Sequence, residues 1–357
     1  MERSLKKTEK HEAQGELVLE QVKELAAREG LSGWKLAQET MLKLQPNTMA
    51  LKQAINHVMT EYKPDFFRPA IVSLCCQAVG GESSRTLPFG ATLVLLGRAI
   101  GIHDDIIDHL KKRNGRPTLF GKFGQATALV VSDILMFKGF TLLRKGLEYG
   151  VSQEETNKIL ETIDHIWFEQ GESETLETQS RGKLDITPQE CLAKIRMRAS
   201  ELEAITRTGG ILGNGSSEKL KALGSFGRLL GTMSLLRDEL IDMLELEMLE
   251  QRIKHESFPL PIIYAIQDAY TKAKIVPIIN KKRFTQKDLK DISKLINDAG
   301  GMGYAAGLIS ELGQKAYTEV RSMNLKKVEL RLLIDSLLLQ PENWNALLVS
   351  SPVPRSS

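Results

Sequence analysis

The sequence has few cysteines and little net charge. Its 357 residues include three cysteines and carry a formal charge of only +3. The odd number, the adjacency of Cys75 and Cys76, and the lack of metal-ligand spacing argue against a disulfide framework and suit a reducing cytoplasm. A charge this small for the length does not predict a nucleic-acid surface.

Long apolar runs, secretion signals and flexible linkers are also missing. No uninterrupted apolar run reaches the roughly 18 residues expected of a membrane span. The N-terminal stretch MERSLKKTEKHEAQGELVLE is too polar for a signal peptide. No Gly/Ser- or Pro-rich segment divides the chain, and no fixed-period repeat occurs. These absences predict one soluble cytoplasmic domain without a transmembrane segment.

Helical periodicity dominates what the sequence does contain. Segments such as 16–28 and 48–62 place their apolar residues on one face, and Gly30 is a plausible end of the first of them. Longer helices are expected over 188–213 and 217–250. Alternating β-branched residues are scarce, and hairpin dipeptides are not flanked by strand-like segments. We therefore expect an all-α fold with about ten to twelve helices.

Two acidic clusters with similar spacing follow apolar helical segments. They are DDIID and DELID, whose carboxylates are Asp104, Asp105, Asp108, Asp238, Glu239 and Asp242. Residues four apart share a helix face, so the outer aspartates of each cluster project together. Such pairs are common on solvated helix faces, but carboxylates that end buried helices need partners. Mg²⁺ is a natural partner because it takes carboxylate oxygens together with substrate phosphates.

These motifs resemble those of the trans-isoprenyl diphosphate synthase (polyprenyl synthetase) family. HDDIID resembles the first aspartate-rich motif, and KRNGRPT falls where that family has Arg-Arg-Gly-x-Pro-Thr. GRLLGTMSLLRDELID is similar to the stretch that carries the second motif, and FFRPAIV resembles the end of the early Gly-Gly-Lys-Arg-x-Arg-Pro motif. The resemblance runs from about residue 60 to the last helices. It implies a single-domain isoprenoid synthase fold around a deep central cavity.

The resemblance also implies how the chain is divided and what it does. The expected parts are an N-terminal helical extension over 1–47 that packs on the same domain, an isoprenoid synthase domain over 48–345, and a tail over 346–357. A homodimer is implied. Three Mg²⁺ ions are expected to ionise an allylic prenyl diphosphate, whose carbocation then joins an acceptor.

Residue roles follow from the same resemblance. Asp104, Asp108, Asp238 and Asp242 are expected to hold the metal ions, with Asp105 in support, and Arg113 to contact the allylic diphosphate. These residues, except Asp105, form the expected catalytic set. The other residues expected to bind substrate are Arg68, Arg198, Arg237, Glu239, Arg252 and Lys254. Glu172 is expected in the polar role of the family's Gly-Gln-x-x-Asp segment.

Several positions depart from the family pattern. Asp65 stands at a lysine, Gly97 at a histidine and Asn114 at the second arginine of the site that grips the second diphosphate. Of that set only Arg68 remains. An aspartate in place of a lysine repels a diphosphate. The half of the site that binds the allylic diphosphate is thus predicted to be intact, and the half that binds isopentenyl diphosphate mostly lost.

Three functions follow from this pattern. The first is a prenyltransferase that uses isopentenyl diphosphate held differently, or another acceptor. The second is a terpene synthase-like cyclase or lyase, although DELID lacks the usual Asn/Ser/Glu pattern of its second metal site. The third is a non-catalytic subunit of a heteromeric prenyl synthase. A weak membrane contact through a lipid product stays open in each case.

Overall fold

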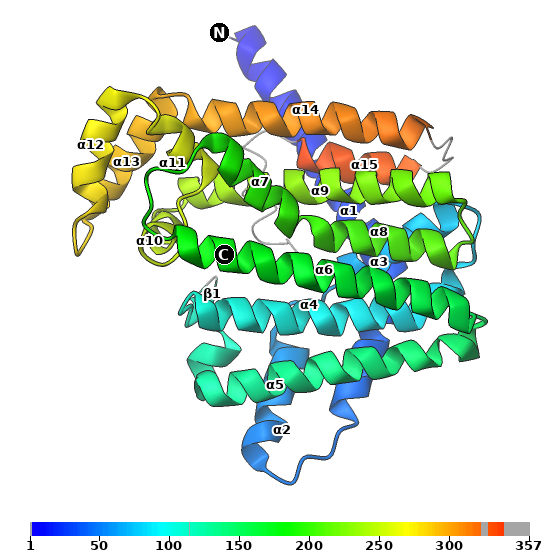
Figure 1. The fold of residues 1–357 in the computed structure, drawn as a ribbon. Helices are drawn as coiled ribbons and strands as arrows, with labels where there is room; N and C mark the ends of the chain where they lie inside the picture. Colours follow the sequence, from blue (N-terminus) through cyan, green and yellow to red (C-terminus); the bar gives the residue numbers. More distant parts are fainter. Residues whose placement is uncertain (1, 114, 323–327, 339–357) are drawn as a thin grey trace.

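The computed structural model describes residues 2–113, 115–322 and 328–338, which form a bundle of helices (Figure 1). The helices are α1 (Glu2–Leu42), α2 (Met49–Asn56), α3 (Phe67–Ala78), α4 (Leu87–Ile107), α5 (Leu119–Leu143), α6 (Gln153–Ser180), α7 (Pro188–Arg198), α8 (Ser200–Leu212), α9 (Ser217–Leu244), α10 (Leu246–His255), α11 (Leu260–Ala265), α12 (Ala269–Ile279), α13 (Gln286–Asp298), α14 (Gly301–Ser322) and α15 (Val328–Leu337). The all-α prediction is confirmed. The expected tail over 346–357 lies outside the described residues.

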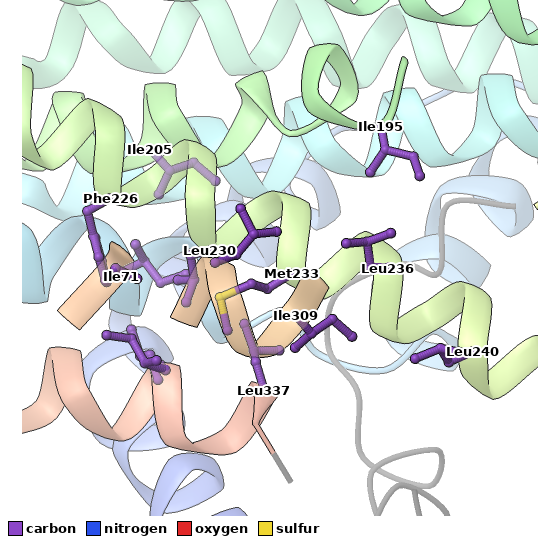
Figure 2. Close-up of a cluster of buried hydrophobic side chains, with 14 of the residues drawn as sticks. Ile71, Ile195, Ile205, Phe226, Leu230, Met233, Leu236, Leu240, Ile309 and Leu337 are labelled. Carbon is purple, nitrogen blue, oxygen red and sulfur yellow. The ribbon is translucent and has the colours of Figure 1, made fainter. Parts of the chain in front are cut away.

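Helix α9 lies at the centre of the larger hydrophobic core. It packs mainly against α8 and α14, and it also contacts α7, α10, α11 and α15. Figure 2 shows side chains from several of these helices meeting around it, including Phe226, Leu230 and Met233 of α9 itself. A Cβ on Gly227 would lie 2.4 Å from the carbonyl oxygen of Leu202, so a glycine is required where α8 crosses.

Helix α1 is one long helix and does not end at Gly30 as predicted. It packs against α3 and α4. A Cβ on Gly30 would lie 1.9 Å from the carbonyl oxygen of Phe66, so this glycine permits close packing and does not stop the helix. A second core forms where Trp34 and Met41 of α1 meet α2, α4 and α5.

The described chain contains more helices than expected, in part because two predicted helices are divided. The segment 188–213 breaks at Ala199 into α7 and α8, and the segment 217–250 breaks at Glu245, whose backbone is extended. A short hairpin was also missed. Strands β1 (Lys112–Arg113) and β2 (Arg116–Pro117) pair antiparallel, and Gly115 adopts a φ of 73° between them. A glycine tolerates this backbone and most residues do not.

Two helical stretches, Ser83–Ile107 and Leu119–Tyr149, are long and apolar enough to cross a membrane, judged by length and composition alone. The sequence prediction considered only uninterrupted apolar runs and did not identify them. In the first stretch 72% of the most apolar window is buried inside the protein, as in the core helix of a folded domain. In the second only 39% is buried, so much of its apolar surface faces outward.

Candidate active site

The first aspartate cluster ends α4. This helix starts with Pro88 in its first turn, is apolar along most of its length and is capped at Asp108, whose N–H bonds the carbonyl oxygen of Asp104. All three aspartates of the cluster are buried. Burial raises the pKa of Asp104 to about 7, with Asp108 and Asp105 adding to the effect and Arg198 opposing it. The cluster therefore needs positive charge, as predicted.

Three arginines from different elements supply positive charge to this cluster. Arg113 of β1 donates to Asp105 at 2.7 Å, and Arg181, just after α6, donates to Asp108 at 2.6 Å. Arg198 at the end of α7 lies 3.8 Å from Asp104. Arg113 and Arg198 are thus where the sequence placed them. Arg181 was not predicted, because an arginine in a polar stretch carries no signal of its own.

The second cluster lies on α9, with Asp238, Glu239 and Asp242 all buried. Arg237 donates to Asp238 at 3.0 Å. Arg252 of α10 donates to Asp242 through Nε at 3.0 Å and Nη2 at 2.8 Å. The predicted residues of this cluster therefore come together, with arginines as their ionic partners.

Glu239 has a structural task that the sequence did not reveal. Its carboxylate accepts the N–H of Leu260 at 2.9 Å, at the start of α11. Burial raises the pKa of Glu239 to about 7, against the opposing effect of Arg252. The contact fixes the segment after α10 onto α9. Glu239 therefore holds the start of α11 against α9, and its expected contact with substrate stays a prediction.

Helix α10 connects the two clusters. Gln251 donates to the carbonyl oxygen of Asp108 at 3.3 Å, and Arg252 reaches Asp242. Glu256 follows directly, 2.8 Å from Arg252. Burial raises the pKa of Glu256 to about 7; Arg252 opposes this, while Asp108 and Asp242 both raise the pKa further. Asp108 of the first motif and Asp242 of the second therefore both raise the pKa of Glu256. Figure 1 shows β1 and α10 at the same end of the bundle.

Helix α6 contributes two acids that sequence reasoning missed. Glu172, the predicted polar residue, is exposed. Glu174 instead has its pKa raised to about 7, first by burial and then by Asp104. Burial would also raise the pKa of Glu177, but Lys194 and Arg198 outweigh it and lower the pKa to about 2. Their i, i+3 spacing was the available signal, although it also fits a solvated helix face.

Lys254 has its contacts with residues other than the two aspartate clusters. It pairs with Glu250 one turn earlier, and its ammonium lies 5.4 Å from the ring centroid of Phe284. Lys254 and Arg252 are two residues apart on α10 and so point in different directions. Arg252 contacts Asp242 of the second cluster, and the expected role of Lys254 in binding substrate stays a prediction.

Arg68 of α3 lies against Gly97 of α4, at the other end of a narrow pocket. This pocket runs from Asp104 and Arg198 to Arg68 and Glu201 and has a volume of about 50 Å³. The deep cavity expected from the resemblance is thus narrow at this point. Asn114, which replaces the family's second arginine, lies outside the described residues.

The donor set fits a hard divalent cation. All outer donors of both clusters are carboxylate oxygens, and burial leaves Asp104 with a pKa raised to about 7. Across the described ranges, no three acidic, histidine or cysteine side chains form a group able to hold a metal ion. Mg²⁺ is typically held by one or two carboxylates and completed by substrate phosphates and water, so the paired carboxylates of each cluster suit it.

Comparisons with known proteins agree on one family. The model of the polyprenyl synthetase family matches residues 49–296. Geranylgeranyl diphosphate synthase of Methanosarcina mazei is 26% identical over 249 residues, covering 68% of this chain and 74% of that protein. Geranylfarnesyl diphosphate synthase of Aeropyrum pernix is 24% identical over 283 residues, covering 76% of this chain and 88% of that protein.

Solved structures give the same result for the fold. Geranylgeranyl pyrophosphate synthetase from Pyrococcus horikoshii superposes with a TM-score of 0.76 at 25% identity, covering 92% of this chain and 98% of that one. Polyprenyl synthase from Caulobacter crescentus, complexed with calcium and isoprenyl diphosphate, gives a TM-score of 0.74 at 18% identity, covering 95% and 97% of the two chains. The isoprenoid synthase fold predicted from the sequence is confirmed.

Proposed function

The chain belongs to the polyprenyl synthetase family, and we propose that it is a Mg²⁺-dependent prenyltransferase that ionises an allylic diphosphate and joins the carbocation to an acceptor. The observation that carries this proposal is the meeting of two buried carboxylate clusters around α10. Gln251 of this helix donates to the carbonyl oxygen of Asp108 at 3.3 Å and its neighbour Arg252 donates to Asp242 at 2.8 Å, which supports a single site shared by the two motifs. Relatives named as prenyl diphosphate synthases support the same chemistry.

Metal ions in this site would be held by Asp104 and Asp108 of α4 and by Asp238 and Asp242 of α9. We propose three Mg²⁺ ions, which when bound would stabilise the negative charge of the departing diphosphate. Asp105 would support the first cluster through its 2.7 Å bond with Arg113.

Arginines of the site would pair with the diphosphate when it binds. Arg113, Arg181 and Arg198 each hold or approach an aspartate of the first cluster. An arginine fork suits phosphate oxygens as well as carboxylates. We propose that these side chains turn from carboxylate to phosphate while the metal ions take the carboxylates.

The outward face of α5 and α6 supports the proposed homodimer. Phe137 of α5 and Phe168 of α6 are 73% and 68% exposed. Between the two helices lies a groove of about 620 Å³, lined mainly by apolar side chains that include Phe140, Leu160 and Trp167. An exposed apolar surface of this kind marks a protein interface. A second copy covering this face also accounts for the low burial of the apolar stretch Leu119–Tyr149.

Incubation with radiolabelled allylic diphosphates tests the proposal. Chains of increasing length are supplied with MgCl₂, with and without isopentenyl diphosphate, and products are separated by chromatography. The proposal predicts release of inorganic pyrophosphate and transfer of the prenyl label to an acceptor. A hydrocarbon formed with every substrate would favour a cyclase or lyase. No turnover of any chain length would contradict the proposal and favour a non-catalytic subunit.

A further inference from the structure

The guanidinium of Arg68 is held between two carboxylates. Its Nη1 donates to Asp65 at 2.6 Å and its Nε donates to Glu201 at 2.7 Å. Arg68 and Asp65 are both buried, with exposures of 7% and 2%. Two carboxylates at this distance leave the guanidinium with more negative than positive charge around it.

Gly97 of α4 leaves the space that the guanidinium of Arg68 occupies. A Cβ on Gly97 of α4 would lie 2.3 Å from Nε and 2.4 Å from Cζ of Arg68. The guanidinium therefore fills the space that any larger side chain at position 97 would need. Arg68 is held against α4 by this contact and by its two ion pairs, and it does not extend freely into the pocket.

One pocket lies beside Asp104, a proposed metal ligand, and so offers space for a second reactant. It is lined by Arg68 and Glu201 at one end and by Asp104 and Arg198 at the other. Each arginine that lines it lies within 4.0 Å of a carboxylate. An incoming diphosphate would have to break both ion pairs of Arg68 and would then face Asp65 and Glu201, which repel it.

We propose that this pocket takes an uncharged acceptor that carries an O–H group and excludes an acceptor that carries a diphosphate. Asp65 and Glu201 determine this specificity because they occupy the hydrogen-bonding groups of Arg68. Glu201 also lines the pocket and receives a hydrogen bond from the O–H group of the second reactant. The proposal rests on the proposed function, because it names the second reactant of that reaction.

The transfer step balances without a further reagent. The bond between C1 of the prenyl chain and the diphosphate oxygen breaks, and its electron pair stays on the diphosphate. A lone pair of the acceptor oxygen forms the new bond to C1. The proton that the acceptor loses is taken up by the released diphosphate. Water or an alcohol satisfies this scheme, giving a prenyl alcohol or ether.

Binding of labelled isopentenyl diphosphate tests the exclusion without relying on activity. Equilibrium dialysis compares the wild-type protein with the double variant Asp65→Asn/Glu201→Gln, which keeps both side-chain shapes and removes both charges. The double variant is expected to bind roughly tenfold more tightly or better, because Arg68 becomes available to the anion. Glu203→Gln is the control, since Glu203 on the same helix pairs with Arg228 instead.

Equal affinity of wild type and double variant would overturn the proposal, and so would tight binding by the wild type. Circular dichroism and thermal melting establish that each variant is folded. If the double variant unfolds, the single variant Glu201→Gln, at a partly exposed position, is expected to show a smaller gain in the same direction.

Product analysis tests the acceptor class itself. With an allylic diphosphate, MgCl₂ and 3-methyl-3-buten-1-ol, the label is expected in a prenyl alcohol or ether, and added isopentenyl diphosphate does not lengthen the chain. A longer labelled diphosphate would overturn the inference while leaving the proposed function intact. No release of pyrophosphate would contradict the proposed function, and the binding experiment would still decide the inference.

Discussion

Replacing Arg252 by methionine tests the charge balance of the second aspartate cluster. Arg252 is buried, with 4% of its surface exposed. It donates two hydrogen bonds to Asp242 and lies 2.8 Å from Glu256. Methionine keeps the length and apolar character of the stem but removes the cation. Two buried carboxylates would then share the site without the arginine that now lies between them.

The expected loss of stability follows from this geometry. Removing one partner of a buried ion pair costs about 3–5 kcal/mol. The entropy of unfolding is about 2.1 cal/mol/K per residue. For a chain of 357 residues, the melting temperature of Arg252→Met should therefore fall by roughly 4–7 °C. MgCl₂ with inorganic pyrophosphate should recover part of this loss, because a cation at Asp242 replaces the missing charge.

Thermal unfolding in EDTA measures the effect, with Lys254→Met as the matched control. Lys254 lies two residues away on α10 and forms only a partly exposed pair with Glu250. Its loss should change the free energy of unfolding by no more than about 1 kcal/mol. If Arg252→Met melts at the same temperature as Lys254→Met, Arg252 does not balance the second cluster and the reasoning is wrong.

Three further predictions concern stability and assembly. Gly97→Ala places a methyl group 2.3 Å from Arg68 and should lower the free energy of unfolding by about 1–3 kcal/mol through overpacking. The control Gly307→Ala has open space around it and should be neutral or stabilising. Equal melting temperatures of the two variants would contradict this. Burial raises the pKa of Glu155, but its helix cap and a paired arginine lower it below 4.5. Glu155→Gln should therefore be less stable than wild type at pH 7, and the difference should shrink as pH falls below 4.5; a difference independent of pH in urea unfolding would refute this. Phe137→Asp should shift the sedimentation coefficient from dimer to monomer, and an unchanged dimer would exclude the α5–α6 face.

The fold could be predicted because its signals are local. Helical periodicity and the two aspartate motifs identified an all-α bundle with the carboxylates at helix ends. The positions at which helices end were harder to predict. Gly30 was predicted to end a helix, yet it serves the contact with Phe66, and a glycine that permits close packing cannot be distinguished from a terminating one without the partner helix.

The candidate site was predicted only in part. The aspartates and Arg113 belong to short motifs with characteristic spacing. Their grouping could therefore be predicted. Arg181 and Glu256 come from segments distant in sequence and reach the site only because α6 and α10 end there. The ion pair of Arg68 with Glu201 spans 133 residues, so no motif could reveal it.

The release of pyrophosphate from an allylic diphosphate tests the central claim most directly. Its rate is measured against MgCl₂ concentration for the wild type, for Asp104→Asn and for Glu154→Gln, a control at an exposed acid in the first turn of α6. The wild type and Glu154→Gln should release pyrophosphate only with MgCl₂, and Asp104→Asn should be slower by at least about 100-fold. Wild-type turnover by Asp104→Asn, or release in EDTA, would contradict the account.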